Sequence, residues 1–251
     1  MKKIGVLSGN IIKLIALVTM VFDHIACILI PSSNPAYNVL RAIGRLSFPL
    51  FAFMIAEGAK YTRNKIRYFL VIFGCGIAFQ IPYMICLNTD VLNIFITFSF
   101  SILIIYALDF FKRCLFDKDC KVIFKILTGL LFISSIVITY FIPRLIGHTS
   151  YGFYGILCAP FASGLNTRCI KEAPGWLKKL DCLPLRLLCM LIPLAYYNIR
   201  VVGGGYNLVA LLALVILLFY NEKRGKLRLK YLFYIFYPAH LLLLYLLSLI
   251  I

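Results

Sequence analysis

The chain has 251 residues, of which 63% are hydrophobic and only 14% are charged, and its mean hydropathy is +0.96. This composition excludes an ordinary soluble domain, because most of the length must lie in lipid. The formal net charge of +17 does not indicate nucleic-acid binding, since the basic residues lie in short loops between apolar runs and not on a polar, folded surface.

Apolar runs predict an all-α polytopic integral membrane protein with about nine transmembrane helices. A helix of about 20 residues crosses a hydrocarbon core of roughly 30 Å. In chain order, the predicted spans are residues 11–30, 40–59, 66–87, 92–111, 122–142, 151–165, 184–199, 207–220 and 231–251. No internal repeat or separate soluble segment interrupts them, so residues 1–251 are expected to form a single transmembrane domain.

The loop charges alternate along the chain and predict the orientation. Basic residues gather before the first predicted span and after the second, fourth, sixth and eighth, at 2–13, 60–67, 112–121, 168–179 and 223–230. The positive-inside rule places these segments in the cytoplasm, which puts the N-terminus inside and the C-terminus outside. We therefore expect a multi-pass protein of the inner (cytoplasmic) membrane, in contact with membrane lipids.

The nine cysteines include no Cys-x-x-Cys pair, and Cys27, Cys75, Cys86, Cys158 and Cys189 fall within or at the ends of apolar spans. Such residues are interpreted as small membrane hydrophobes. No metal is expected.

The first span carries an ionisable pair, Asp23 and His24, about 18 to 20 Å along a helix that starts near residue 11. Ionisable groups at this depth cost at least a few kcal/mol unless they are paired, so the pair is a functional hypothesis. Adjacent helical residues point roughly 100° apart, and Asp23 is therefore expected to orient a group on another helix, with Arg45 and His240 as candidates.

The second span carries Arg41 and Arg45 four residues apart, near its outer end. We expect Arg41 to extend to the outer headgroups and Arg45, which lies deeper, to take part in function. His240 lies near mid-depth in the last span.

Lys13 lies eleven residues before His24, on the same helix face and about 16 Å away. A cation at the cytoplasmic mouth can hold a coenzyme A phosphate while the thioester reaches His24, although a plain interfacial anchor also explains Lys13. Glu57, near the inner end of the second span, is a further candidate contact to the donor, with a half-solvated position as the alternative.

Two polar positions are substrate candidates. Asn93 lies in the fourth span, where structural hydrogen bonding is an equal alternative. Tyr151 lies in the turn at 147–152 that opens the sixth span on the outer side. Free helix amides there can hold an oxyanion or acceptor, although a plain loop is an equal alternative.

These residues resemble the TraX family, named for a conjugation enzyme that N-acetylates pilin. The matching pieces are Lys13 with Asp23-His24-Ile25, Gly44-Arg45 with Phe48-Pro49-Leu50-Phe51, Asn93 with Phe95 and Thr97, Ser150-Tyr151-Gly152 with Gly155, Tyr220-Asn221 with Lys223-Arg224-Gly225, and Phe236-Tyr237-Pro238 with His240-Leu241. The Lys13-to-His24 spacing also resembles the basic-x10-His signature of the acyltransferase-three family. Gln80 departs from the acid that many members carry.

The resemblance implies a membrane-embedded acyltransferase that takes an acetyl group from cytoplasmic acetyl-coenzyme A. His24 is then the general base, Asp23 and Arg45 its orienting shell, His240 a second acid-base or acceptor-binding group, and Lys13 the phosphate contact. The expected acceptor is a peptide amine or a cell-surface glycan or polymer hydroxyl. The alternatives are a proton-coupled transporter or exporter using the Asp-His pair as a relay, and a scaffold of an envelope assembly machine.

Overall fold

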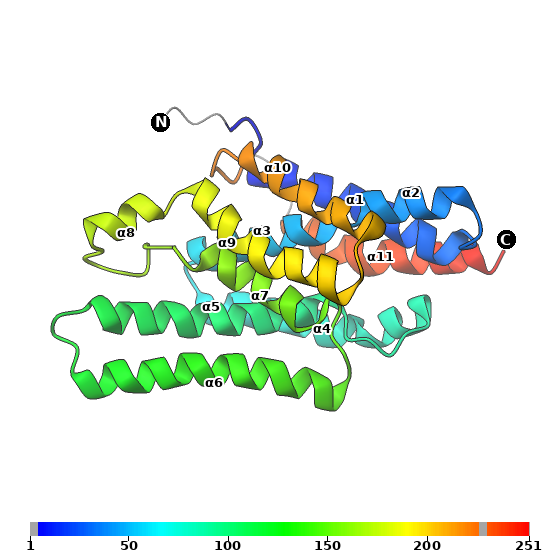
Figure 1. Cartoon of the computed structure of the whole chain (residues 1–251). Helices are drawn as coiled ribbons and strands as arrows, with labels where there is room; N and C mark the ends of the chain where they lie inside the picture. Colours follow the sequence, from blue (N-terminus) through cyan, green and yellow to red (C-terminus); the bar gives the residue numbers. More distant parts are fainter. Residues whose placement is uncertain (1–4, 226–229, 251) are drawn as a thin grey trace. The chain divides into compact units, whose positions relative to one another are not determined.

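The structure is a computed structural model that describes residues 5–225 and 230–250, and side chains in the second range from residue 235 onward. Its elements are α-helices with two short irregular helices, and no strand is assigned in these ranges. Figure 1 shows the helices in order. They are α1 (Gly9–Leu29), α2 (Pro35–Gly44), α3 (Ser47–Tyr61), α4 (Lys65–Leu87), α5 (Ile94–Phe116), α6 (Val122–Ile146), α7 (Gly152–Ser163), α8 (Gly175–Leu180), α9 (Leu183–Tyr196), η1 (Tyr197–Val201), η2 (Gly205–Leu211), α10 (Leu212–Leu218) and α11 (Lys230–Ser248).

Five described helical segments are long and apolar enough to cross a membrane, namely Gly9–Leu29, Pro35–Tyr61, Lys65–Leu87, Ile94–Phe116 and Val122–Ile146. They coincide with the first five predicted spans, which supports a helical, multi-pass membrane protein. The next three predictions fall on shorter helices, such as the 12 residues of α7 and the 14 of α9, and the last falls on α11, of which Ile235–Ser248 entered the length comparison. The length criterion therefore supports five spans, and the count of nine and the orientation stay predictions.

The described residues group into two compact units. The first contains described residues of Met1–Met54, Ala78–Asp90 and Leu194–Ile251, and the second contains Ile55–Ile77 and Val91–Pro193. The chain passes from one to the other within α3, α4 and α9 and in the segment between α4 and α5. The prediction of a single domain over residues 1–251 stays a prediction.

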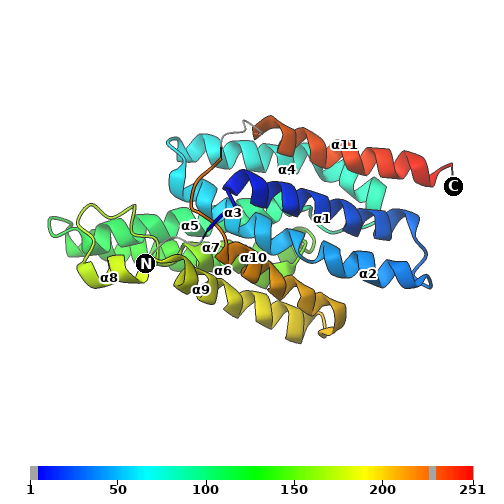
Figure 2. The same cartoon turned by 90° about the horizontal axis from the view of Figure 1, so that it is seen from above.

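In the first unit, α1 packs against α2 and α11, and Figure 2 shows it lying between them. Its start is fixed by Ser8, whose hydroxyl caps the amide of Ile11. The segment after α10 returns to this point, because Leu7 pairs with Tyr220 in an isolated β-bridge. The core of this unit includes Ile12, Ala16, Leu50, Phe53 and Leu241, all at most 2% exposed.

The second predicted span is broken in the structure. Helix α2 ends at Gly44 and α3 begins at Ser47, so Arg45 lies at the junction. Pro49 is in the first turn of α3, where its missing N–H costs nothing, whereas further along a continuous helix it would remove a hydrogen bond. The break therefore follows from the proline, and it places Arg45 at a helix end.

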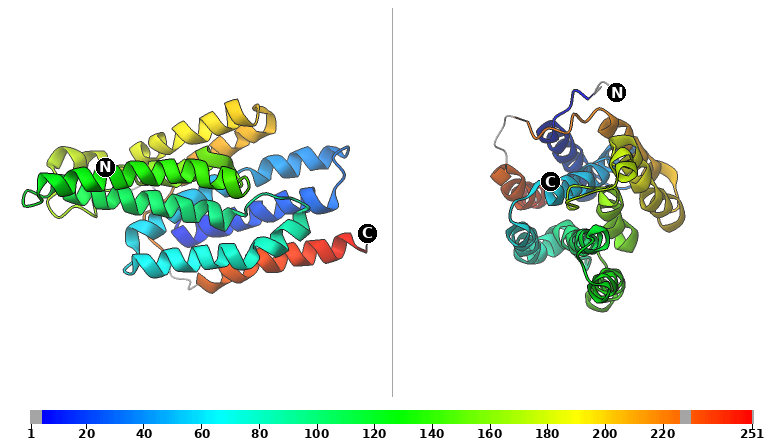
Figure 3. Two further views of the ribbon diagram at one scale, coloured as in Figure 1. Left: turned by 90° about the horizontal axis from the view of Figure 1, so that it is seen from below. Right: turned by 90° about the vertical axis from the view of Figure 1, so that its left-hand side faces the viewer.

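In the second unit, α5 packs against α6 and α7, and Figure 3 shows the two green helices α5 and α6 side by side. Asn93 caps α5 through the amides of Phe95 and Ile96. Ile102, Ile104 and Ile105 of α5 are at most 1% exposed, whereas α6 leaves most of its apolar side chains exposed. A helix that is apolar all round and exposed on most sides is typical of contact with lipid.

Candidate functional site: a histidine pair and an arginine-clamped aspartate

The two histidines predicted in the first and last spans meet in the first unit. Nδ1 of His24 on α1 lies 2.7 Å from Nε2 of His240 on α11, and the rings stack with centroids 5.0 Å apart. Tyr237 presents its ring edge-on to both imidazoles, at 6.4 Å and 5.8 Å. His240 is only 6% exposed. The structure therefore joins two residues 216 positions apart into one partly buried pair.

A third contact decides which ring nitrogens carry protons. Nδ1 of His240 lies 2.8 Å from the carbonyl oxygen of Phe236, which can only accept, so Nδ1 carries the proton. In neutral His240, Nε2 is then an acceptor, and Nδ1 of His24 must donate to it. The remaining nitrogen, Nε2 of His24, keeps its lone pair. This assignment makes Nε2 of His24 the basic atom of the pair.

Asp23, the neighbour of His24, faces two arginines and not the histidines. Its Oδ2 lies 2.8 Å from Nη1 of Arg41 and its Oδ1 lies 3.0 Å from Nη2 of Arg45. The three side chains are between 11% and 17% exposed. One carboxylate and two guanidinium groups leave this cluster with a formal charge of +1.

Arg41 contradicts the sequence analysis. It was expected to extend to the outer headgroups, but it pairs with Asp23 and donates to Sγ of Cys27 at 2.7 Å. The four-residue spacing of Arg41 and Arg45 was the signal that was available, because it puts both guanidinium groups on one face. Whether that face meets lipid or another helix depends on where α1 lies, which the sequence alone does not state.

A glycine permits the close approach of α1 and α2. A Cβ atom added at Gly44 would overlap Cβ, Cγ and Oδ1 of Asp23. The residue before Arg45 must therefore lack a side chain for Asp23 to reach both arginines.

Lys13 lies on the first turns of α1, in the same unit as the histidine pair. The segment that follows α10 runs alongside this end of the helix, with the carbonyls of Lys223 and Arg224 accepting from the amides of Gly9 and Asn10. Lys13 lies within electrostatic range of Arg224. The structure thus adds two cations from a distant segment to the one that the sequence analysis named.

Glu57 belongs to the second unit and has a defined partner. Its Oε1 lies 2.6 Å from Nη2 of Arg186 on α9, and Arg186 also donates from Nε to the carbonyl of Ala162. Both charged side chains are at most 6% exposed. The sequence analysis missed Arg186 because it lies in an otherwise apolar helix. The cofactor role of Glu57 stays a prediction.

Asn93 and Tyr151 also lie in the second unit. Asn93 is fully buried, caps α5 and donates to the carbonyl of Gly76 at 2.7 Å. Tyr151 precedes α7 in the left-handed region at φ 64°. The structure gives Asn93 a structural role, and the substrate roles of both residues stay predictions.

Another buried charge cluster was missed. Asp109 of α5 accepts from Nζ of Lys65 at 3.0 Å and lies 3.7 Å from Nζ of Lys112, which donates to the carbonyls of Gly164 and Asn166. These bonds fasten the loop after α7 to α5. Within the described residues, no three His, Cys, Asp or Glu side chains gather as metal ligands would.

Two comparisons with known proteins found a match. A family model described as TraX protein matches residues 8–248. A relative, the probable fimbrial assembly protein FimC, serogroup H1, of Dichelobacter nodosus, is 37% identical over 65 residues, which are 25% of this chain and 27% of that protein. The chain thus matches only about a quarter of the relative's length. No solved structure matches.

Proposed function

The chain belongs to the TraX family, and we propose that it is a membrane-embedded acyltransferase that moves an acetyl group from acetyl-coenzyme A to a peptide amine. The observation that carries the proposal is the hydrogen-bonded pair of His24 and His240, which leaves one imidazole nitrogen free as a base inside a helix that is long enough to span a membrane. A hydroxyl of a cell-surface glycan or polymer is the second acceptor class.

The reaction needs one proton to be moved. The acceptor amine attacks the thioester carbonyl, Nε2 of His24 takes the amine proton, and the C–N bond forms while the carbonyl oxygen becomes an oxyanion. Collapse of this intermediate breaks the C–S bond, and the coenzyme A thiolate takes the proton from His24. The products are the acetylated acceptor and free coenzyme A.

The surrounding residues serve this step through His24. His240 accepts a hydrogen bond from Nδ1 of His24, holds the ring in the productive tautomer and supports the imidazolium that forms. The cluster of Asp23, Arg41 and Arg45 has a formal charge of +1, which favours the developing oxyanion in a low-dielectric site. Asp23 holds the two guanidinium groups in place, so its role is to position them.

The donor is proposed to enter at the first turns of α1. Lys13, Lys223 and Arg224 supply cations for the coenzyme A phosphates at this end of the helix. Eleven residues of helix separate Lys13 from His24, which is about 16 Å, the reach needed by an extended pantetheine arm. Glu57 is bound to Arg186 in the second unit, and its contact with the donor stays a prediction.

The acceptor proposal draws on the comparisons. The TraX family is associated with pilin acetylation, and the relative's name refers to fimbrial assembly. Both favour a peptide amine over a glycan hydroxyl. We place the enzyme in the inner (cytoplasmic) membrane, with the donor on the cytoplasmic side and Tyr151 on the acceptor side.

The test follows labelled acetyl groups. Purified protein in detergent receives acetyl-coenzyme A labelled in the acetyl group, together with a pilin-like peptide with a free N-terminal amine, the same peptide with a blocked amine, or a cell-wall glycan. We expect label on the free amine alone. Label on no acceptor, combined with proton uptake by vesicles that contain the protein, would replace the acyltransferase with the proton-coupled transporter.

A further inference from the structure

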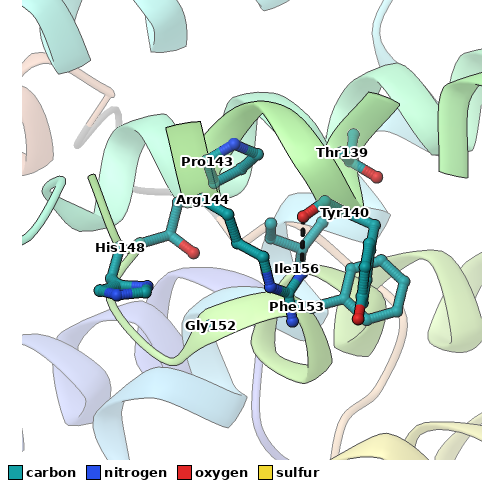
Figure 4. A pocket seen from close by; sticks show the side chains of 9 residues that line it. Thr139, Tyr140, Pro143, Arg144, His148, Gly152, Phe153 and Ile156 are labelled. Atoms are coloured by element: carbon teal, nitrogen blue, oxygen red, sulfur yellow. Dashed lines mark hydrogen bonds between the residues drawn. The ribbon is translucent and has the colours of Figure 1, made fainter. Parts of the chain in front are cut away.

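A small cavity lies in the second unit, at the end of α6 and the start of α7. It has a volume of about 130 Å³ and is lined by Thr139, Tyr140, Pro143, Arg144, His148, Thr149, Gly152, Phe153 and Ile156. Figure 4 shows Arg144 between His148 on one side and Tyr140 on the other. None of the residues proposed above for acyl transfer lines this cavity.

The guanidinium group of Arg144 is held in place. It stacks on the ring of Tyr140 at 3.6 Å, and its Nη1 donates to the carbonyl of the same residue at 2.5 Å. Phe153 of α7 packs edge-on against Tyr140 from a centroid distance of 5.1 Å. A stacked arginine loses little entropy when it binds an anion, and its other N–H groups remain as donors.

The loop opposite Arg144 is also fixed. The carbonyl of His148 accepts from the amide of Leu92 at 2.7 Å, and the carbonyl of Leu92 accepts from the amide and hydroxyl of Ser150. Thr149, between them, is only 5% exposed, and its hydroxyl makes no hydrogen bond in the part of the chain that the structure describes. Thr149 lines the cavity, so its hydroxyl can donate to a ligand there.

The side chains that line the cavity include basic groups, an arginine and a histidine, and no acidic group. Helix α7 begins at Gly152, whose amide donates to the carbonyl of Thr149, and the positive end of the helix dipole lies at this side of the cavity. These groups together favour an oxyanion.

The surroundings of the cavity are apolar. On α6, Phe141, Leu145 and Ile146 are 56%, 83% and 63% exposed, and this helix is long and apolar enough to span a membrane. An anion bound here lies beside a surface that suits acyl chains. A ligand with both an anionic group and apolar chains fits these two features at once.

We propose that this cavity binds the phosphate group of an anionic phospholipid, with its acyl chains lying along the exposed face of α6. Arg144 and His148 contact the phosphate, and the hydroxyl of Thr149 donates to it. The proposal is independent of acyl transfer, because it rests on other residues in the other compact unit.

The test is native mass spectrometry of the full-length protein in detergent with phosphatidylglycerol or with phosphatidylcholine of the same chains. We expect phosphatidylglycerol to bind at least roughly tenfold more tightly to wild type than to Arg144→Gln, since a charge-assisted contact is lost. Arg200→Gln is the matched control, because Arg200 is also exposed and near a helix end but does not line the cavity. Thr149→Val is expected to weaken binding as well.

Three results would overturn the proposal. Equal binding of phosphatidylglycerol to wild type and Arg144→Gln would exclude the cavity as the site. Equal binding of the two lipids by wild type would exclude recognition of an anionic lipid. Displacement of phosphatidylglycerol by millimolar inorganic phosphate at an unchanged protein melting temperature would identify a site for free anions instead.

Discussion

The position of the proton on Nδ1 of His24 depends on His240, which lies 216 residues further along the chain. His240 can accept that proton only because its own Nδ1 donates to the carbonyl of Phe236. In many enzymes a third group orients the base that activates the nucleophile. Here His240, a neutral imidazole, orients His24 in this way.

We predict that replacement of His240 lowers turnover and leaves donor binding unchanged. His240→Phe removes the acceptor for the His24 proton, and kcat should fall roughly 10²-fold while the KM for acetyl-coenzyme A stays the same. His240→Gln offers an amide oxygen and should recover part of the loss. A rise in KM with normal kcat would instead give His240 a substrate-binding role.

The charges around Asp23 predict an order of stabilities. Asp23→Asn leaves two partly buried guanidinium groups without their carboxylate, whereas Arg41→Gln leaves the pair of Asp23 and Arg45. Uncompensated buried charge costs about 3 to 5 kcal/mol, discounted here for partial exposure. Thermal unfolding in detergent should place Asp23→Asn below Arg41→Gln. The reverse order would mean that Arg41, and not the aspartate, holds α1 to α2.

At the scale of helices, the contact of α1 with α2 depends on Gly44. Gly44→Ala should separate the two helices at Asp23, lower the melting temperature by an amount equivalent to about 1 to 3 kcal/mol, and reduce acetyl transfer. Gly74→Ala in α4 is the control, because an added Cβ atom meets nothing within 4 Å there. Equal effects of the two substitutions would remove the steric argument.

Helices α3 and α9 are joined by the ion pair of Glu57 and Arg186, which is buried on both sides. Glu57→Gln should destabilise the protein by about 3 kcal/mol or more, and Glu57→Gln combined with Arg186→Met should recover part of the loss. The KM for acetyl-coenzyme A should not change. A normal melting temperature with a raised KM would instead support the cofactor contact expected from the sequence.

Sequence reasoning reached the helices and some of the site, for identifiable reasons. Helical geometry separated Asp23 from His24 and named Arg45 and His240 as possible partners of Asp23. The structure supplies the contact with Arg45, whereas His240 pairs with His24. The second span was expected as one helix over residues 40–59, whereas the structure ends α2 at Gly44 and begins α3 at Ser47. The ion pair of Arg41 with Asp23 was not expected, because the sequence does not state which face of α2 meets α1, and Arg186 was missed because it lies in an otherwise apolar helix.

At the scale of the whole molecule, the loop charges predict the direction in which the spans cross the membrane. The alternation of basic loops predicts that the segment after α5 is cytoplasmic and that the turn before α7 is outside. An alkaline phosphatase fusion after residue 149 should be active, and one after residue 117 should be inactive. Two active fusions would contradict the predicted orientation and, with it, the placement of donor and acceptor on opposite sides.

The most direct test of the central claim is coenzyme A release from acetyl-coenzyme A by the purified full-length protein, with a free peptide amine as acceptor. Wild type should release coenzyme A, and His24→Ala should be at least roughly 10²-fold slower at an unchanged melting temperature. Release that is equal in the two proteins, or absent from folded wild type with amine and glycan acceptors alike, would contradict an acyltransferase based on His24.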